Sequence, residues 1–342
     1  MGPEIIVASL STWMMPAIFV VSGASIFFAL RKPGTGRYIK DKTLRILVPL
    51  VVGMFTHDTL QAYLEQINHG AIVGSFWQWY PTYLTGGRWG FYHLWYLYYL
   101  FLFSMFCLPL FQWLRDGAGK RVLAWLGDKL AAPGAVYLPM LLVILPAVLM
   151  NPNVGGLGDY NSYGGWNIPA YLVFFLGGFA IVSSERLQAS ILRQRWISLA
   201  IGLVAYLVFA GVYMATGELT YGAPTYPLIW TMRSVSAWSG VLAILGFGMQ
   251  RLTARTPFLE YANEAVLPFY VLHQSVLIAI GFFVVQTAMP DLLKWAIIFA
   301  SSFATILVLY EFAIRRVNVL RFLFGMKLVK KAEAVTAQPA RA

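Results

Sequence analysis

The chain has 342 residues, of which 59% are hydrophobic and only 11% are charged. So few charged side chains cannot cover a water-exposed surface of this size, which excludes a soluble globular domain and places the chain in a bilayer. The single cysteine, Cys107, excludes an intrachain disulfide framework and a cysteine metal site. The formal net charge of +11 would also suit a nucleic-acid-binding protein. The positions of the basic residues must therefore decide whether the charge reflects membrane topology or nucleic-acid binding.

Nine apolar stretches, separated by turn residues or charge clusters, approach the length of about 20 residues that a helix needs to cross a membrane. In chain order they cover residues 5–30, 44–64, 91–114, 135–150, 167–183, 197–215, 227–250, 265–287 and 292–313. We therefore predict an all-α fold, a polytopic transmembrane bundle of about nine helices. The stretch FLGGFA (175–180) is typical of a close-packing surface for a neighbouring helix.

The basic residues gather in alternate loops. Of the 25 lysines and arginines, 22 fall in segments 31–45, 115–134, 184–196 and 251–264 or after the last predicted helix, leaving Arg88, Arg233 and Lys294. Positive loops stay in the cytoplasm during insertion, so these five segments are predicted to be cytoplasmic. The charge is thus explained by topology, and no nucleic-acid partner is expected.

This topology puts Met1 outside the cell and Ala342 in the cytoplasm. The first predicted helix has no basic segment before it and is too long for a signal-peptide core, so it is not a cleaved export signal. Either a further helix is encoded upstream of Met1, or the N-terminus is external.

Six segments occur in a characteristic order: WMMPAIFVVSG (13–23), RILVPL (45–50), HLWYLYYLFLF (93–103), YLVFFLGGF (171–179), FLEYANEAVLPFYVLHQSVL (258–277) and FLFGMK (322–327). As an ordered set, across residues 5–328, they resemble the acyltransferase 3 family of integral membrane acyltransferases. That family includes O-acetylases of cell-surface polysaccharides and succinyltransferases of periplasmic glucans. Its members usually have an earlier helix with an arginine and a histidine regarded as catalytic. No such helix precedes Met1, so the resemblance favours an upstream start and leaves open whether the chain as given is active.

The resemblance implies transfer of an acyl group, of the acetyl or succinyl type, from cytoplasmic acyl-CoA to a hydroxyl of an extracytoplasmic carbohydrate. It implies a multi-pass protein of the bacterial cytoplasmic (inner) membrane, with a membrane acyltransferase-like domain at 1–328 and a disordered cytoplasmic tail at 329–342. The expected partners are membrane lipids, acyl-CoA as donor and a glycan acceptor, without a permanently bound cofactor or metal. An inactive relative and a transporter of lipid-linked or small substrates stay open as alternatives, although a transporter would be expected to show an internal repeat.

Acyl transfer to a hydroxyl needs a general base and hydrogen-bond donors for the oxyanion of the tetrahedral intermediate. Polar residues inside an apolar bundle cost free energy, so those present are candidate site residues. His93 opens the third predicted helix at its outer end, beside Trp89 and Trp95. It suits a base on the acceptor side with stacking faces for a sugar, or else a member of an interfacial aromatic belt.

His273 follows Pro268 and lies about 13 Å into the membrane from the cytoplasmic end of its helix, at 1.5 Å per residue. That depth suits a role near the thioester donor, or else a hydrogen bond between helices. Adjacent His57 and Asp58 point about 100° apart on a regular helix, so the sequence does not predict a base and its orienting carboxylate there.

Three cations are candidates for binding substrate. Arg233 lies inside a helix, where it could bind an acidic acyl group, a glycan acid or a phosphate, or else snorkel and pair with an outer carboxylate such as Glu218. Lys42 and Arg45 could bind the phosphates of coenzyme A, although topology alone also requires them. The predicted site therefore comprises His93 and His273 as catalytic residues and Arg233, Trp89, Trp95, Lys42 and Arg45 as substrate-binding residues.

Overall fold

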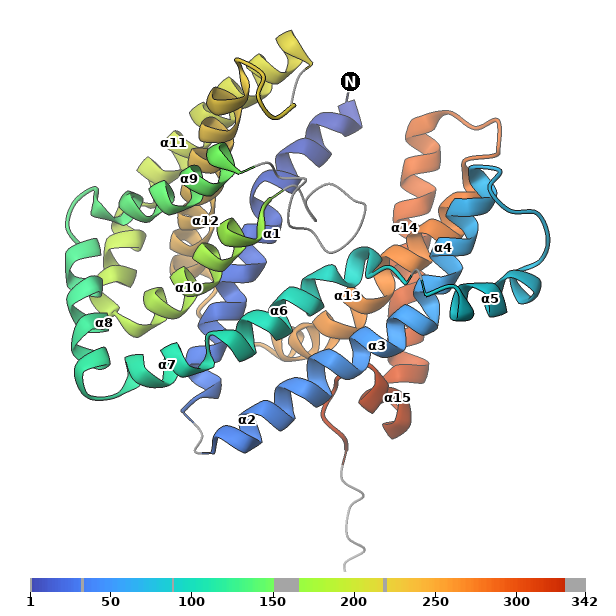
Figure 1. The fold of residues 1–342 in the computed structure, drawn as a ribbon, viewed down its shortest axis with the longest axis horizontal. Helices are drawn as coiled ribbons and strands as arrows, with labels where there is room; N and C mark the ends of the chain where they lie inside the picture. The colour runs from blue at the N-terminus through green and yellow to red at the C-terminus, as the bar shows by residue number, and fades with distance from the viewer. Residues whose placement is uncertain (1, 32–33, 88, 151–165, 218–219, 330–342) are drawn as a thin grey trace, which may run out of the picture. The chain divides into compact units, whose positions relative to one another are not determined.

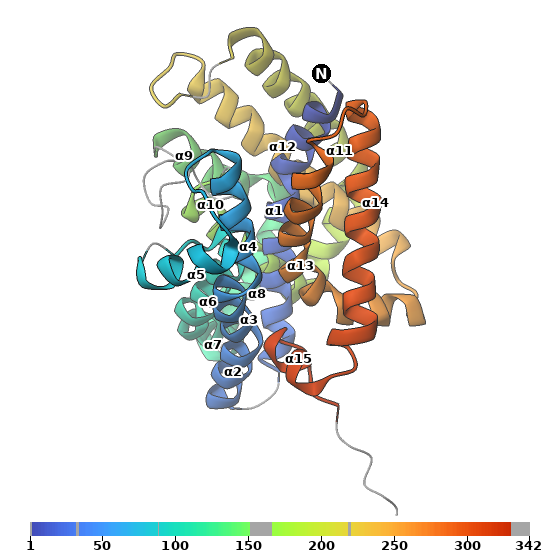
Figure 2. The same ribbon diagram turned by 90° about the vertical axis from the view of Figure 1, so that its right-hand side faces the viewer.

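Every regular element in the part of the chain that the computed structural model describes is a helix (Figures 1 and 2). The described residues are 2–31, 34–87, 89–150, 166–217 and 220–329. The α-helices are α1 (Gly2–Ala29), α2 (Thr35–Lys42), α3 (Val48–Phe55), α4 (His57–Asn68), α5 (Phe76–Thr85), α6 (Trp95–Phe106), α7 (Leu108–Arg115), α8 (Gly117–Leu130), α9 (Leu141–Leu149), α10 (Ile168–Ser183), α11 (Glu185–Thr216), α12 (Tyr226–Arg251), α13 (Pro257–Val284), α14 (Asp291–Leu309) and α15 (Asn318–Leu323). Two π-helical segments, η1 (Thr43–Leu47) and η5 (Tyr310–Ile314), and two 3-10 turns, η2 (Tyr92–Leu94) and η3 (Ala135–Met140), complete the fold. The predicted all-α class is confirmed.

All nine predicted apolar stretches coincide with helical segments. Six segments are long and apolar enough to cross a membrane on their own: Leu10–Ala29, Thr35–Asn68, Glu185–Thr216, Tyr226–Arg251, Pro257–Val284 and Asp291–Ile314. Two bent pairs would raise the number to eight, and the ninth stretch is the shorter apolar helix α10. The described residues therefore contain six to eight candidate spans, where nine were predicted.

The two bends have visible causes in the sequence. The pair α6 and α7 bends by 49° at Cys107, where Pro109 lacks the backbone N–H needed to continue the helix. The pair of α8 and the segment Ala135–Leu149 bends by 110° at Gly134, whose φ of 77° is the left-handed conformation that favours glycine. The break at Cys107 interrupts a stretch that is apolar throughout, so hydropathy does not reveal it, whereas the break at Gly134 lies between the charged helix α8 and the apolar segment Ala135–Leu149.

Several helices begin with a side-chain cap. Asn167 accepts a hydrogen bond from the Ala170 N–H at 3.0 Å at the start of α10, and Thr256 accepts one from the Leu259 N–H at 3.2 Å at the start of α13. Each cap satisfies one of the backbone donors that the first helical turn leaves unpaired. A proline follows each cap in the first turn, where its missing N–H costs nothing.

The chain divides into two compact units, Met1–Ile39 with Tyr99–Arg255 and Lys40–Tyr98 with Thr256–Ala342. The first unit is built around α1 packed on α10, and α11 packed along α12 (Figure 1). A Cβ on Gly178 would lie 2.7 Å from the carbonyl carbon of Val20, and a Cβ on Gly23 would lie 2.8 Å from that of Phe175. The backbones of α1 and α10 therefore touch at reciprocal glycines, which confirms the predicted close-packing role of FLGGFA.

The second unit is built around α13, which packs on α4 and lies beside α14 (Figure 2). Its core cluster contains Ala265, Leu272, Ile306, Tyr310, Ile314 and Met326. Met326 follows α15, so the end of the described chain is part of this core. Of the predicted tail 329–342, residues 330–342 lie outside the described residues, as do Arg88 and Glu218.

Candidate functional site

A buried polar cluster in the second unit contains three of the four histidines of the chain. Its members are His57 and Asp58 at the start of α4, His93 in η2, and Tyr270, His273 and Ser275 on α13. The break between α3 and α4 brings the first two into the cluster. Thr56, with φ −122° and ψ −94°, leaves the helical conformation, and the helix restarts at His57.

Asp58 is the centre of this cluster and is completely buried. Its Oδ1 atom lies 3.0 Å from His57 Nδ1 and 3.5 Å from His93 Nδ1, and it accepts a hydrogen bond from the Ser275 hydroxyl at 3.2 Å. A buried carboxylate is tolerated only with such partners, because removing an ion from water is costly. Position 58 in the first turn of α4 also lets the helix dipole favour the negative charge.

The hydrogen bonds determine where the protons of His93 lie. Its Nε2 atom is 2.9 Å from the Val271 carbonyl, which can only accept, so Nε2 carries the proton. In a neutral imidazole Nδ1 would then present a lone pair to the Asp58 oxygen, and two acceptors would face each other. The 3.5 Å separation of these two atoms is therefore a close approach of His93 to the carboxylate.

His57 and Asp58 contact each other, contrary to the expectation from their adjacent positions. That expectation assumed a regular helix, whereas the break at Thr56 precedes His57 and changes the direction of its side chain. His57 Nδ1 also lies 3.0 Å from the Ser275 hydroxyl oxygen. The sequence therefore did not predict the contact between His57 and Asp58, because that contact depends on the φ and ψ angles of Thr56.

His273 lies against His93, with ring centroids 5.0 Å apart and planes at 88°. Its Nδ1–H donates to the Tyr270 carbonyl at 2.6 Å, so the lone pair of Nε2 is left to accept a proton. The Tyr270 hydroxyl in turn donates to the His93 carbonyl. The sequence favours a role on the acceptor side for His93 and a role near the donor for His273, and η2 and α13 bring their rings together.

The predicted aromatic residues differ in exposure. Trp89 is 47% exposed and donates its indole N–H to the Tyr83 carbonyl at 3.1 Å, while Trp95 is only 8% exposed. Burial raises the pKa of the Tyr83 phenol to about 12, so its hydroxyl stays neutral and donates to the Met54 carbonyl at 3.2 Å. Of the two predicted tryptophans, only Trp89 has an exposed ring that a ligand could contact.

The predicted cations lie in different parts of the fold. Arg45 is an exposed residue of η1, and its Nε–H donates to the Gly325 carbonyl at 3.2 Å, while Lys42 is the last residue of α2. In the first unit, Arg233 of α12 is 8% exposed, with its guanidinium carbon 4.6 Å from the Trp166 ring centroid and 4.8 Å from that of Trp230. Two indole faces thus enclose this cation.

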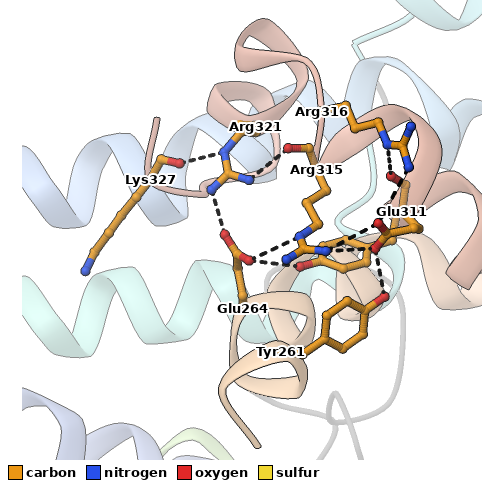
Figure 3. A network of polar contacts seen from close by, with 8 residues as sticks. Tyr261, Glu264, Glu311, Arg315, Arg316, Arg321 and Lys327 are labelled. Carbon is orange, nitrogen blue, oxygen red and sulfur yellow. Dashed lines mark hydrogen bonds and ion pairs between the residues drawn. The ribbon is translucent and has the colours of Figure 1, made fainter. Parts of the chain in front are cut away.

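A second polar network, which the sequence did not single out as a whole, joins α13, η5 and α15 (Figure 3). Glu264 of α13 forms ion pairs with Arg321 at 2.6 Å and with Arg315 at 3.6 Å. Glu311 and Arg315, four residues apart, also form an ion pair at 3.1 Å. Arg321 is only 5% exposed, and this burial could not be foreseen because it depends on the chain folding back after α14.

Within the described residues, no group of three or more histidine, cysteine, aspartate or glutamate side chains is arranged to hold a metal ion. A family model described as an acyltransferase domain matches residues 2–311. No curated protein and no solved structure matches the chain.

Proposed function

Since the chain belongs to this family of acyltransferases, the acyltransferase 3 family, we propose that it moves an acetyl- or succinyl-type group from cytoplasmic acyl-CoA to a hydroxyl of an extracytoplasmic carbohydrate. The proposed setting is the bacterial cytoplasmic membrane, with the C-terminus in the cytoplasm. The membrane location is supported by the apolar helices that are long enough to cross a bilayer, and the orientation by the basic loops.

The observation that carries the proposal is the pair of contacts made by the His273 ring. Its Nδ1–H is bound to the Tyr270 carbonyl, and its ring lies 5.0 Å from that of His93. A neutral imidazole oriented in this way has Nε2 as its proton-accepting atom, which is what a general base requires. His273 is therefore the proposed base.

In the proposed reaction the acceptor O–H gives its proton to His273 Nε2 while its oxygen attacks the thioester carbonyl carbon. The tetrahedral intermediate then collapses, the C–S bond breaks, and the His273 imidazolium returns the proton to the sulfur of coenzyme A. The buried Asp58 carboxylate would stabilise the positive charge that His273 gains with the proton, and His93, 3.5 Å from Asp58 and packed against the His273 ring, would keep that ring in place. His57 and Ser275 keep the Asp58 carboxylate in place.

The proposed binding groups follow from exposure and charge. Arg45 and Lys42 would bind the phosphates of coenzyme A, and the exposed ring of Trp89 would stack on the acceptor sugar. Trp95 is buried, so packing accounts for it better than ligand contact does. Arg233 is as buried as Trp95 and is enclosed by two indole rings, so packing inside the first unit accounts for it better than ligand contact does.

The test uses the protein in lipid nanodiscs with radiolabelled acetyl-CoA or succinyl-CoA and a panel of bacterial surface glycans. His273→Gln is expected to slow transfer by about 10²- to 10⁴-fold, the usual effect of losing a placed proton-transfer group. His93→Gln is expected to slow it as well, because the His93 ring packs against that of His273. Both variants should still bind the donor. Transfer by the parent protein would exclude an inactive relative and a transporter, since neither catalyses acyl transfer. His69→Gln is the matched control, because His69 is exposed at the end of α4 and lies outside the cluster. Full transfer by His273→Gln would refute the assignment of the base.

A further inference from the structure

The segment that follows α15 is fixed by a single buried arginine (Figure 3). Arg321 donates from Nη2 to the Glu264 carboxylate at 2.6 Å, from Nε to the Lys327 carbonyl at 2.7 Å and from Nη1 to the Arg315 carbonyl at 2.9 Å. The guanidinium thus joins α13, the residue after η5 and the residue at the far end of segment 324–327. Three acceptors in three directions match the rigid fork of arginine, and a lysine ammonium cannot reproduce them.

The fixed segment is packed on the start of α3. Gly325 has a φ of 68°, and a Cβ there would lie 2.8 Å from Leu267 Cδ2, 2.9 Å from Pro49 Cγ and closer still to the Arg45 carbonyl oxygen. No other residue type fits this backbone conformation and this spacing without strain. The position of Gly325 is therefore set from both sides, by Arg321 and by α3.

Two residues of the candidate site depend on that position. The Gly325 carbonyl accepts the Nε–H of Arg45 at 3.2 Å, which fixes one edge of the Arg45 guanidinium and leaves its terminal nitrogens to bind a ligand. The ring of Phe324 stacks on His57, with centroids 6.5 Å apart and an interplanar angle of 21°. One short segment thus contacts both the exposed cation and the buried cluster.

We propose that Arg321 is a positioning residue for the acyl donor: by holding segment 324–327 it orients Arg45 to bind the phosphates of an acyl-CoA. This proposal rests on the proposed function, in which Arg45 binds those phosphates. Arg321 itself, being buried and bonded to three protein groups, has no part in contacting the donor. Its effect is transmitted through the Gly325 carbonyl.

The test compares Arg321→Lys with Arg316→Lys, the same substitution on the exposed arm of the network, where Arg316 bonds Glu311 and not segment 324–327. Binding of acetyl-CoA and the KM and kcat of transfer are measured for each in nanodiscs. Arg321→Lys is expected to weaken donor binding and raise KM about tenfold, the effect of losing one charge-assisted hydrogen bond, with kcat at saturating donor unchanged. Arg316→Lys should bind the donor like the parent protein.

A double-mutant cycle with Arg45→Ala separates positioning from general damage to the fold. If Arg321 acts through Arg45, then Arg321→Lys has no further effect on donor binding in the Arg45→Ala background. Donor binding by Arg321→Lys equal to that of the parent, or an equal loss in both backgrounds, would overturn the inference. Arg45→Ala with intact donor binding would instead refute the donor site of the proposed function.

Should Arg321→Lys fail to fold, Glu264→Gln decides the matter, because it keeps the shape and one acceptor oxygen of the partner carboxylate. The inference is supported if Glu264→Gln weakens donor binding in the parent background and has no further effect in the Arg45→Ala background. An unchanged donor affinity in the parent background overturns it.

Discussion

The crossing of α1 and α10 makes a sharp prediction about Gly178. In Gly178→Ala the new Cβ would lie 2.7 Å from the Val20 carbonyl carbon and 3.0 Å from the Ala24 nitrogen, whereas ordinary contact begins at 3.4 Å. The obstructing atoms belong to the backbone and cannot rotate away. The two helices must therefore move apart by at least 0.7 Å, so that the distance from Cβ to the Val20 carbonyl carbon rises from 2.7 Å to 3.4 Å. Overpacking of this kind costs about 1–3 kcal/mol.

Alanine also favours a helix over glycine by about 1 kcal/mol, which partly offsets the overpacking. Because backbone atoms obstruct the site, we take the upper end of the overpacking cost, about 3 kcal/mol, and subtract about 1 kcal/mol for the helix preference of alanine. Gly178→Ala should therefore lower the free energy of unfolding by about 2 kcal/mol. The neighbouring Gly177→Ala is the matched control, since its Cβ would meet only the tip of Trp238 at 3.4 Å. It should be neutral or stabilising by up to about 1 kcal/mol.

The chain supplies its own probe for this measurement. Cys107 is a buried free cysteine in the same compact unit, so a thiol-reactive fluorophore reports unfolding in detergent as temperature rises. Gly178→Ala should unfold several degrees below the parent protein and Gly177→Ala should not. Equal unfolding temperatures for the two variants would refute the idea that the backbones touch at Gly178.

Three further predictions concern the second unit and the topology. Asp58→Asn should slow acyl transfer by about 10²-fold or more, measured as labelled glycan per minute, because the negative charge beside His57 and His93 is lost; an unchanged rate would contradict the proposed role of Asp58. Gly325→Ala should lower the free energy of unfolding by about 2–5 kcal/mol, the combined cost of a left-handed alanine and overpacking, and thermal unfolding at the parent's temperature would contradict it. Lys120→Cys and Arg193→Cys, made without Cys107, should react with membrane-impermeant maleimide only after the cytoplasmic face is opened; labelling of intact cells would refute the topology derived from the basic loops.

The positions of the helices could be predicted from the sequence, because the length of an apolar stretch is a local property. A bilayer requires about 20 apolar residues in a helix that crosses it. Each of the nine stretches coincides with a helical segment, and FLGGFA indicated close packing before its partner helix was known. The bend at Cys107 was missed because it interrupts a stretch that is apolar on both sides, whereas the bend at Gly134 coincides with the predicted start of an apolar stretch at residue 135. Hydropathy responds to composition, and the break at Cys107 changes the direction of the chain without changing its composition.

For the candidate site, the sequence by itself determined which side chains are unusual: three histidines, Asp58 and Arg233 within apolar segments are costly, and such residues stand out by composition alone. Tertiary structure alone decided which of them meet. His57 and Asp58 converge because Thr56 breaks the helix before them, and His93 and His273 touch because η2 and α13 approach from distant parts of the chain. The role of Arg321 was equally hidden, since its three partners are separated along the chain from residue 264 to residue 327. Burial and hydrogen-bond direction depend on contacts between segments far apart in sequence, and a local pattern of residue types contains no record of those contacts.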